Sequence, residues 1–154
     1  MGGGPMMGDP LVRFQAEHQE ALAVLNRLEA AALSLRRAGD AGPYLAAALE
    51  AHAFLSTAVR AHNDNEERAL FPLLGDDAPT AVFIEEHRRL RELEGELARV
   101  ARTGDAPGTA DVAIEVVELL RAHIAREDEV LFPLARGHLG PSGLAQVAAR
   151  LGDS

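Results

Sequence analysis

A repeated pattern of histidine, glutamate and a Leu-Phe-Pro end restricts this chain more than any other feature. Residues 62–72 read HNDNEERALFP, and residues 123–133 read HIAREDEVLFP. Residues 17–22, EHQEAL, recur more loosely as EHRRL at 86–90. Because the two patterns alternate along the chain, we interpret the sequence as a duplicated helical hairpin.

Helices are the only regular elements that the sequence predicts. Alanine and leucine dominate, aromatic residues make up only 4% of the chain, and no alternating β-branched stretch is bounded by hairpin turns. Glycine and proline divide the chain into long segments with short loops, which favours antiparallel neighbours. The predicted fold class is therefore all-α, an up-down-up-down four-helix bundle with a short C-terminal helix. The expected helices lie at about residues 10–38, 43–70, 79–103, 109–131 and 142–150, with Asp77 as a cap of the third.

The length of 154 residues suits a single domain. Residues 1–9 are expected to be a disordered leader, residues 10–136 the bundle, and residues 137–154 a C-terminal extension that holds the short helix. The first residues lack the basic and apolar regions of a signal peptide, and no run approaches the roughly 18 apolar residues of a membrane span. We expect a cytoplasmic protein, monomeric or weakly homo-oligomeric, with no membrane partner.

Composition excludes several kinds of chemistry. The net charge of −9 argues against a nucleic-acid surface, which would show clustered basic residues. The chain has no lysine, which excludes Schiff-base chemistry, and no cysteine, which excludes disulfides, thiolate metal sites and cysteine nucleophiles. Any metal must therefore be held by nitrogen and oxygen ligands.

Four of the six histidines lie on apolar helix faces. Around His18, for example, the positions three, four and seven residues away include Leu11, Phe14, Leu22 and Leu25. Residues at these offsets share one face of a helix. The same test finds apolar residues around the other three, so all four imidazoles are expected to point into the core: His18, His62, His87 and His123.

Two glutamates share these apolar faces. Glu66 follows His62 by four residues and Glu127 follows His123 by four, so each pair projects from one face about a turn apart. A carboxylate inside a bundle is destabilising unless it is paired or bound to a cation, and no buried arginine lies in phase. In an antiparallel bundle the six side chains fall at one level, about 12–15 Å from one end. The sequence therefore predicts a buried cation site.

The ligand set also restricts the metal. Six nitrogen and oxygen ligands exceed the needs of one tetrahedral zinc ion, whereas calcium and magnesium prefer oxygen-only shells. Imidazole with carboxylate suits iron, and helix bundles commonly hold two such metals with carboxylates bridging them. The residues alone predict a dinuclear centre, with iron favoured over manganese and zinc.

These motifs resemble those of the hemerythrin-like, or HHE cation-binding, family. The resemblance rests on residues 17–18, 62–66, 86–87 and 123–127, with Leu-Phe-Pro after the second and fourth, and it covers about residues 10–136. It implies a non-haem di-iron centre completed by an oxo or hydroxo group. By this resemblance one iron would be bound by His18 and His62 and the other by His87 and His123, with Glu66 and Glu127 bridging them.

Two departures from the family pattern bear on function. Oxygen-carrying hemerythrins have a second histidine one turn after the third-helix ligand, where this chain has Arg91. They also have an aspartate five residues after the fourth-helix histidine, and Asp128 has that place here. Glu127 is nevertheless preferred as the ligand, because the repeat aligns it with Glu66 and aligns Asp128 with Glu67. The smaller ligand set leaves a coordination position for water or a small ligand and disfavours simple reversible oxygen carriage.

The remaining histidines are expected outside the centre. His52 lies ten residues before His62, about 15 Å along a helix axis, and His138 follows a proline and a glycine, as a surface turn residue would. Glu17 and Glu86 cannot share the helix faces of the histidines beside them. Each is expected either in solvent or in contact with a neighbouring helix.

The ligand balance predicts the kind of chemistry. Neutral imidazoles donate less negative charge than carboxylates, so a histidine-rich pair of irons is less readily driven to high oxidation states. We therefore expect a protein that binds, senses or detoxifies O2, NO or peroxide, with no catalytic side chain beyond the metal ligands. Two alternatives stay open: a peroxide- or NO-consuming enzyme of catalase-like kind, and iron storage or delivery for the repair of iron centres.

Overall fold

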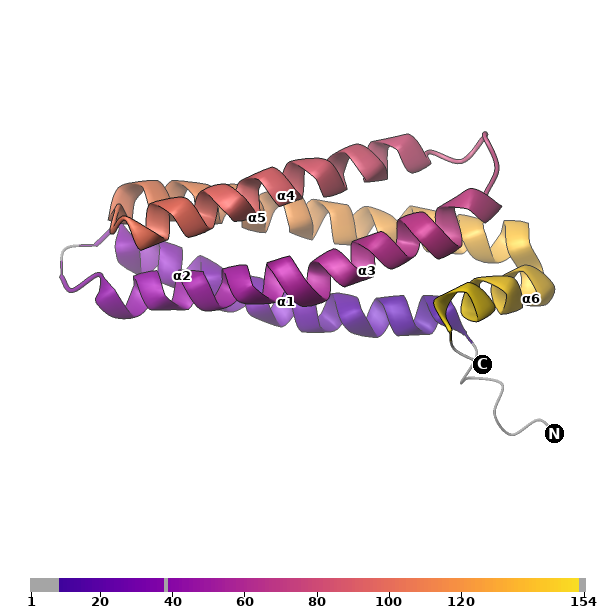
Figure 1. Cartoon of the computed structure of the whole chain (residues 1–154), viewed down its shortest axis with the longest axis horizontal. Helices are drawn as coiled ribbons and strands as arrows, with labels where there is room; N and C mark the ends of the chain where they lie inside the picture. The colour runs from indigo at the N-terminus through magenta and orange to yellow at the C-terminus, as the bar shows by residue number, and fades with distance from the viewer. Residues whose placement is uncertain (1–8, 38, 153–154) are drawn as a thin grey trace.

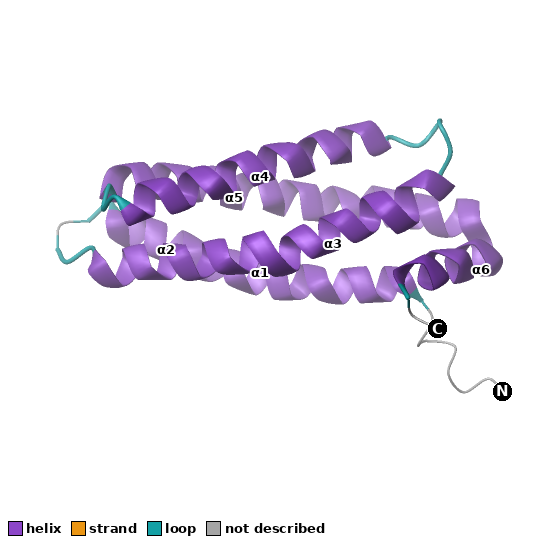
Figure 2. Cartoon of the chain, viewed as in Figure 1, coloured by secondary structure: helices purple, strands orange, loops and turns teal. Residues whose placement is uncertain are grey.

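The computed structural model describes residues 9–37 and 39–152, and within these ranges every regular element is a helix (Figure 2). Most of the predicted leader, residues 1–8, lies outside the described residues, as do Ala38 and residues 153–154. The predicted all-α class is confirmed. The elements are α1 (Pro10–Leu35), α2 (Gly42–Phe54), η2 (Leu55–Val59), α3 (Arg60–Asn65), η3 (Glu66–Leu70), η4 (Phe71–Leu73), α4 (Thr80–Arg102), α5 (Ala106–Arg126), η5 (Glu127–Leu131) and α6 (Phe132–Leu151).

Four long rods lie side by side, and the chain reverses direction at each connecting loop (Figure 1). They are α1, the run from α2 to η3, α4, and the run from α5 to η5. Helix α1 packs against α2 and α5, and α4 packs against the same two helices. Helix α6 first continues the last rod and then, after a kink at Gly140, turns back at the end of the rods (Figure 1). It contacts η3, η4 and α1. The duplicated sequence thus folds as two helical hairpins packed together, with α6 across one end.

Two aspartates explain where the first and the last long rod begin. Asp9 accepts a hydrogen bond from the backbone N–H of Leu11 at 3.0 Å, which satisfies a donor that the first helical turn leaves free. Asp105 accepts one from the N–H of Gly108 at 2.9 Å. Helix α5 therefore begins at Ala106, earlier than the predicted start near residue 109.

Two predicted helix ends are wrong. Asp77 does not cap the third rod, because α4 begins at Thr80 and its first turn has no side-chain cap. The last rod does not stop before Pro133 but continues into α6, as far as a kink at Gly140, whose φ of 61° favours glycine. In a regular α-helix the ring of Pro133 would clash with a carbonyl group of the preceding turn. The π-helical turn η5 lies just before the proline and shifts these carbonyl groups, so the helix continues beyond Pro133.

Two apolar clusters fill the bundle on either side of one polar layer. The larger cluster includes Leu25 and packs the rods together away from α6. The smaller cluster includes Leu11 and packs beneath α6. His18 lies on α1 between Phe14 of the smaller cluster and Ala21 of the larger one, so the polar layer is enclosed above and below by apolar side chains. No helix in the described ranges is both long and apolar enough to cross a membrane.

Candidate metal centre

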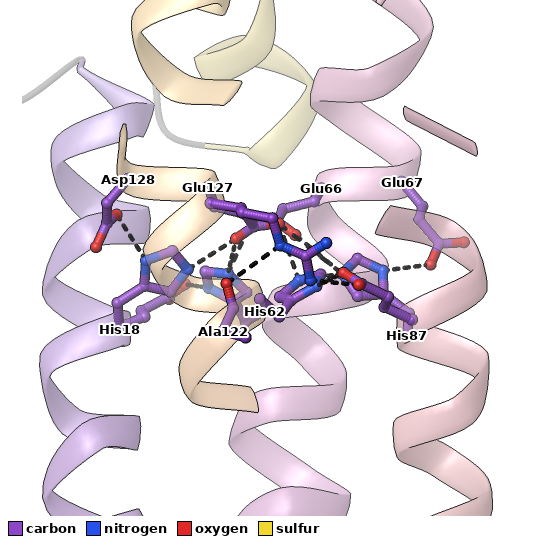
Figure 3. Close-up of polar contacts among 12 residues, drawn as sticks. His18, His62, Glu66, Glu67, His87, Ala122, Glu127 and Asp128 are labelled. Carbon is purple, nitrogen blue, oxygen red and sulfur yellow. Dashed lines mark hydrogen bonds and ion pairs between the residues drawn. The ribbon is translucent and has the colours of Figure 1, made fainter. Parts of the chain in front are cut away.

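The structure brings all six predicted ligand side chains into the polar layer (Figure 3). The histidines come from four different helices, and the glutamates begin the π-helical turns η3 and η5. Every one of the six is buried, with at most 7% of its surface exposed. The six side chains are His18 of α1, His62 of α3, Glu66 of η3, His87 of α4, His123 of α5 and Glu127 of η5.

Each glutamate lies between two histidines of different hairpins. Glu66 Oε2 is 3.1 Å from Nε2 of His62, and its Oε1 is 3.2 Å from Nε2 of His87. Glu127 Oε1 is 2.8 Å from Nε2 of His18, and its Oε2 is 3.1 Å from Nε2 of His123. The glutamates therefore join the two hairpins through their own carboxylates.

Two groups of potential metal ligands result, and both glutamates belong to each group. One adds His18 and His62, the other adds His87 and His123, and within each group the ligand atoms all lie within 4.8 Å of one another. Bridging carboxylates between two histidine pairs suit a pair of metal ions in a helix bundle. The pairing of histidines is the one that the family resemblance implies.

Four outer carboxylates hold the histidines in place from the opposite side of each ring. In each case Nδ1 of a histidine donates to a carboxylate on another helix, which fixes the ring orientation and leaves Nε2 facing the layer. The Nδ1–oxygen distances are 2.8 Å for His18 to Asp128, 2.7 Å for His62 to Glu17, 2.6 Å for His87 to Glu67 and 2.7 Å for His123 to Glu86. Figure 3 shows Asp128 and Glu67 on the two flanks of the layer.

The inner atoms meet the requirement of a cation site. Among the described side chains, two buried oxygens have no hydrogen-bond partner, Glu66 Oε1 and Glu127 Oε2. The Nε2 atoms of His87 and His123 lie 3.1 Å apart, and in the neutral imidazoles each presents a lone pair because Nδ1 donates outward. Acceptors that face one another without a donor are destabilising, whereas a metal ion between them would bind them all. The residues present therefore fit a metal.

Two side chains of the layer have a pKa that is shifted toward the protonated form. Burial alone would lower the pKa of His62, but the carboxylates of Glu66, Glu127 and Glu17 raise it to about 12. Burial and the neighbouring Glu127 carboxylate raise the pKa of Glu66. Both shifts favour the protonated form of a side chain that a metal needs deprotonated, so metal binding must release protons.

A phenylalanine lies against each histidine of the layer. Phe132 stacks on His18 with ring centroids 5.5 Å apart, and Phe71 stacks on His87 at 6.1 Å. On the other two histidines the contact is edge-to-face, Phe14 on His62 at 5.1 Å and Phe83 on His123 at 5.3 Å. These rings, of which Phe132 is the first residue of α6, cover the layer on the side of α6 and exclude water from that side.

The structure also shows where the other candidate residues lie. Glu127 points into the layer, while Asp128 points outward to His18. Arg91 is exposed, His138 is exposed on α6, and His52 is only partly buried on α2, outside both ligand groups.

Glu17 and Glu86 contact histidines of neighbouring helices rather than standing free in solvent. Sequence reasoning missed the corresponding role of Glu67. The signal was present in the repeat, which aligns Glu67 with Asp128 and so places an acidic residue after each inner glutamate.

A cavity of about 180 Å³ reaches the layer next to His18 and His62, and His123 of the other hairpin also lines it. Glu17 and Arg13 lie on its wall nearer the surface, and Leu120 lies on its apolar side. A small molecule could therefore approach the histidines of the first hairpin without displacing a helix.

These features define a helical domain whose buried histidine and carboxylate cluster fits a metal site. The family description "Hemerythrin HHE cation binding domain" matches residues 9–135. The chain belongs to this family, which confirms the resemblance that its motifs indicate. A search of curated proteins and a search of solved structures each give no significant match.

Proposed function

We propose that this chain is a non-haem di-iron protein whose up-down-up-down four-helix bundle binds O2, NO or peroxide. One observation carries the proposal: four histidine nitrogens and four glutamate oxygens converge in a buried layer, where two of the oxygens lack a hydrogen-bond partner among the described residues. The proposed ligands are His18, His62, Glu66, His87, His123 and Glu127.

Charge supports two metal ions of high positive charge. The two inner glutamates are completely buried, and four more carboxylates lie behind the histidines. Arg126 pairs with Glu86 and Arg13 with Glu17, which offsets only part of this negative charge. Iron suits the mixture of imidazole and carboxylate, and its two ions would supply open coordination positions and electrons for a small ligand.

The chain's own residues orient the ligands and control access. The outer carboxylates fix the ring planes, the phenylalanines exclude water from the side of α6, and the cavity leaves His18 and His62 approachable. Because this cavity leads from the surface to His18 and His62, we place small-ligand entry there. The proposal also includes a cytoplasmic location, a monomer or weak homo-oligomer, and no nucleic-acid or membrane partner.

A second candidate function is consumption of peroxide or NO, and the position of Glu17 favours it. Glu17 hydrogen-bonds to His62 and also lies on the cavity wall, with about a third of its side chain exposed. A proton could pass by this carboxylate between solvent and the histidine. Turnover, as opposed to binding, would use such a path.

Anaerobic loading with ferrous iron tests the proposal. We expect two irons per chain, followed by distinct optical spectra on adding O2, NO and peroxide in turn. A stable adduct that reverses under vacuum supports binding, and rapid O2 evolution from peroxide supports the catalase-like alternative. Iron that passes readily to a chelator would support storage or delivery. His138→Ala, an exposed histidine outside the layer, is the matched control and should keep both irons.

A further inference from the structure

The cavity beside His18 and His62 is larger than a diatomic ligand requires. Its volume is about 180 Å³, and an apolar protein cavity of about 150 Å³ is enough to bind benzene. Space for one water or one diatomic molecule needs only a small part of this. The cavity therefore has room for an organic molecule with a ring or a short branched chain.

The walls of the cavity are partly apolar and partly polar, since Arg13, Glu17, Glu20 and Asn65 line it besides the histidines and one buried amide. Phe54, Val59, Leu120 and Ile124 supply most of the apolar surface. Asn63 also lies on the wall, and its side chain is only 4% exposed. Within the described part of the chain no side chain hydrogen-bonds to this amide. The amide atoms are not among the fully buried polar atoms that lack a partner. They are therefore open to the cavity, where a hydrogen-bonding group on a guest can pair with them in place of water.

The two hairpins differ at the cavity wall, where the first hairpin has two smaller side chains and one amide. The repeat pairs His18 with His87 and His62 with His123, so Ala21 corresponds to Leu90 and Ala58 to Leu119. By the same pairing, Asn63 corresponds to Ile124, which replaces the amide by an apolar side chain.

The helix backbone differs too. The π-helical turn η2, Leu55–Val59, interrupts the run from α2 to α3, whereas α5 is α-helical throughout Ala106–Arg126. Isolated π-helical turns often mark functional sites, because they widen a helix where a ligand lies. Small side chains, a buried amide and a widened turn thus occur together in one hairpin, in a chain that otherwise repeats itself.

We propose that this cavity is a binding site for a small uncharged organic molecule, with an apolar body about the size of a benzene ring and one hydrogen-bonding group. The body lies among the apolar wall residues, and its polar group pairs with the amide of Asn63. The guest contacts the open side of His18 and His62, so it also occupies the route by which a small ligand would reach the metals. This inference goes beyond the di-iron proposal and does not depend on which metal is bound.

Fluorine NMR of the iron-loaded protein tests the inference, with 4-fluorobenzyl alcohol and 4-fluorotoluene as probes. The two molecules differ only by the hydroxyl group. We expect both to bind, with signals broadened by the nearby iron, and the alcohol to bind about 2- to 10-fold more tightly through one net hydrogen bond. Asn63→Leu should abolish this preference, and if the preference remains in that variant, the role of Asn63 is wrong.

Ala58→Leu introduces into the cavity the side chain that the other hairpin has at the corresponding position, Leu119. This variant should bind both probes at least tenfold more weakly. Ala53→Leu adds the same side chain at an exposed alanine of α2 that does not line the cavity, and it should bind both probes as the unaltered chain does. Ala21→Leu fills the cavity from α1 and serves if Ala58→Leu does not fold.

Iron content, measured on every sample, separates the two proposals. Loss of probe binding in Ala58→Leu with two irons retained supports the organic-ligand site. No probe binding by an unaltered chain that holds two irons overturns the organic-ligand site and leaves the di-iron proposal intact. Equal weakening by Ala53→Leu and Ala58→Leu also overturns it. Probe binding without iron uptake would contradict only the di-iron proposal.

Discussion

Replacing Glu17 by glutamine keeps the shape of the side chain and removes the negative charge that it presents to His62. The carboxylate oxygen lies 2.7 Å from Nδ1 of His62, a short distance that is typical of a charge-assisted hydrogen bond. The amide can still accept a hydrogen bond, but its oxygen is a weaker acceptor. His62 then binds metal less strongly, because the outer partner no longer raises the basicity of Nε2.

The size of the effect follows from burial. Loss of such an outer partner commonly lowers metal affinity by about 10- to 100-fold. Glu17 keeps 34% of its side chain exposed, and Arg13 lies 3.4 Å from its other oxygen. Solvent and this arginine weaken the charge that His62 experiences, so we expect the low end of the range, about tenfold or about 1.4 kcal/mol.

Anaerobic competition for ferrous iron against a chelator of known affinity measures this change. Glu20→Gln is the matched control, since it removes the charge of an exposed glutamate on the same helix that belongs to neither ligand group and is not one of the four outer carboxylates. The control should bind iron as the unaltered chain does. Equal affinities for the Glu17→Gln and Glu20→Gln variants would show that the outer carboxylate does not act on the metal, and would refute the reasoning.

Three further predictions concern the inner glutamate, the pH dependence and a buried ion pair. Glu127→Ala should lower iron content well below two per chain, whereas Asp128→Asn should keep both irons with weaker affinity; metal analysis after desalting distinguishes them. The pKa of His62 is raised to about 12, so its proton stabilises the metal-free protein fully below about pH 6.5 and this stabilisation is lost as the pH rises toward 12. The Tm of the metal-free protein should therefore fall between about pH 6.5 and pH 9, and the gain in Tm on metal binding should grow; a constant gain would contradict this assignment. Arg60→Ala leaves the buried carboxylate of Glu94 without its ion-pair partner and should lower the free energy of unfolding in urea by about 1–3 kcal/mol, an effect that Glu94→Leu in the same chain should reverse.

The inward position of the inner histidines and glutamates could be predicted because these residues obey the period of their own helices. His62 and Glu66 are four residues apart among apolar neighbours, and that spacing alone places both on the buried face. The role of Glu17 could not be predicted in this way. Its position on α1 follows from sequence, but its contact with His62 depends on the rotation and distance of the next helix.

Departures from the α-helical period account for the other missed features. Glu67 follows an inward glutamate and precedes Arg68, a pattern that usually indicates a solvated face. In the structure the π-helical turn η3 begins at Glu66, and Glu67 reaches His87. The cavity could not be predicted for a related reason. Ala58 is smaller than Leu119 at the corresponding position of the repeat, but this difference in side-chain volume becomes a cavity only when the helices have packed.

The outer carboxylates follow the order of the chain and then close on its beginning. Glu17 of the first rod holds a histidine of the second, Glu67 one of the third, Glu86 one of the fourth, and Asp128 one of the first. Two of these contacts stay within a hairpin and two cross between hairpins. Each hairpin thus contributes two of the four outer carboxylates and two of the four histidines. Two identical hairpins related by a twofold axis would form the same four contacts in the same order. These contacts do not require a covalent connection between the two hairpins, because each hairpin supplies one carboxylate and one histidine to the other.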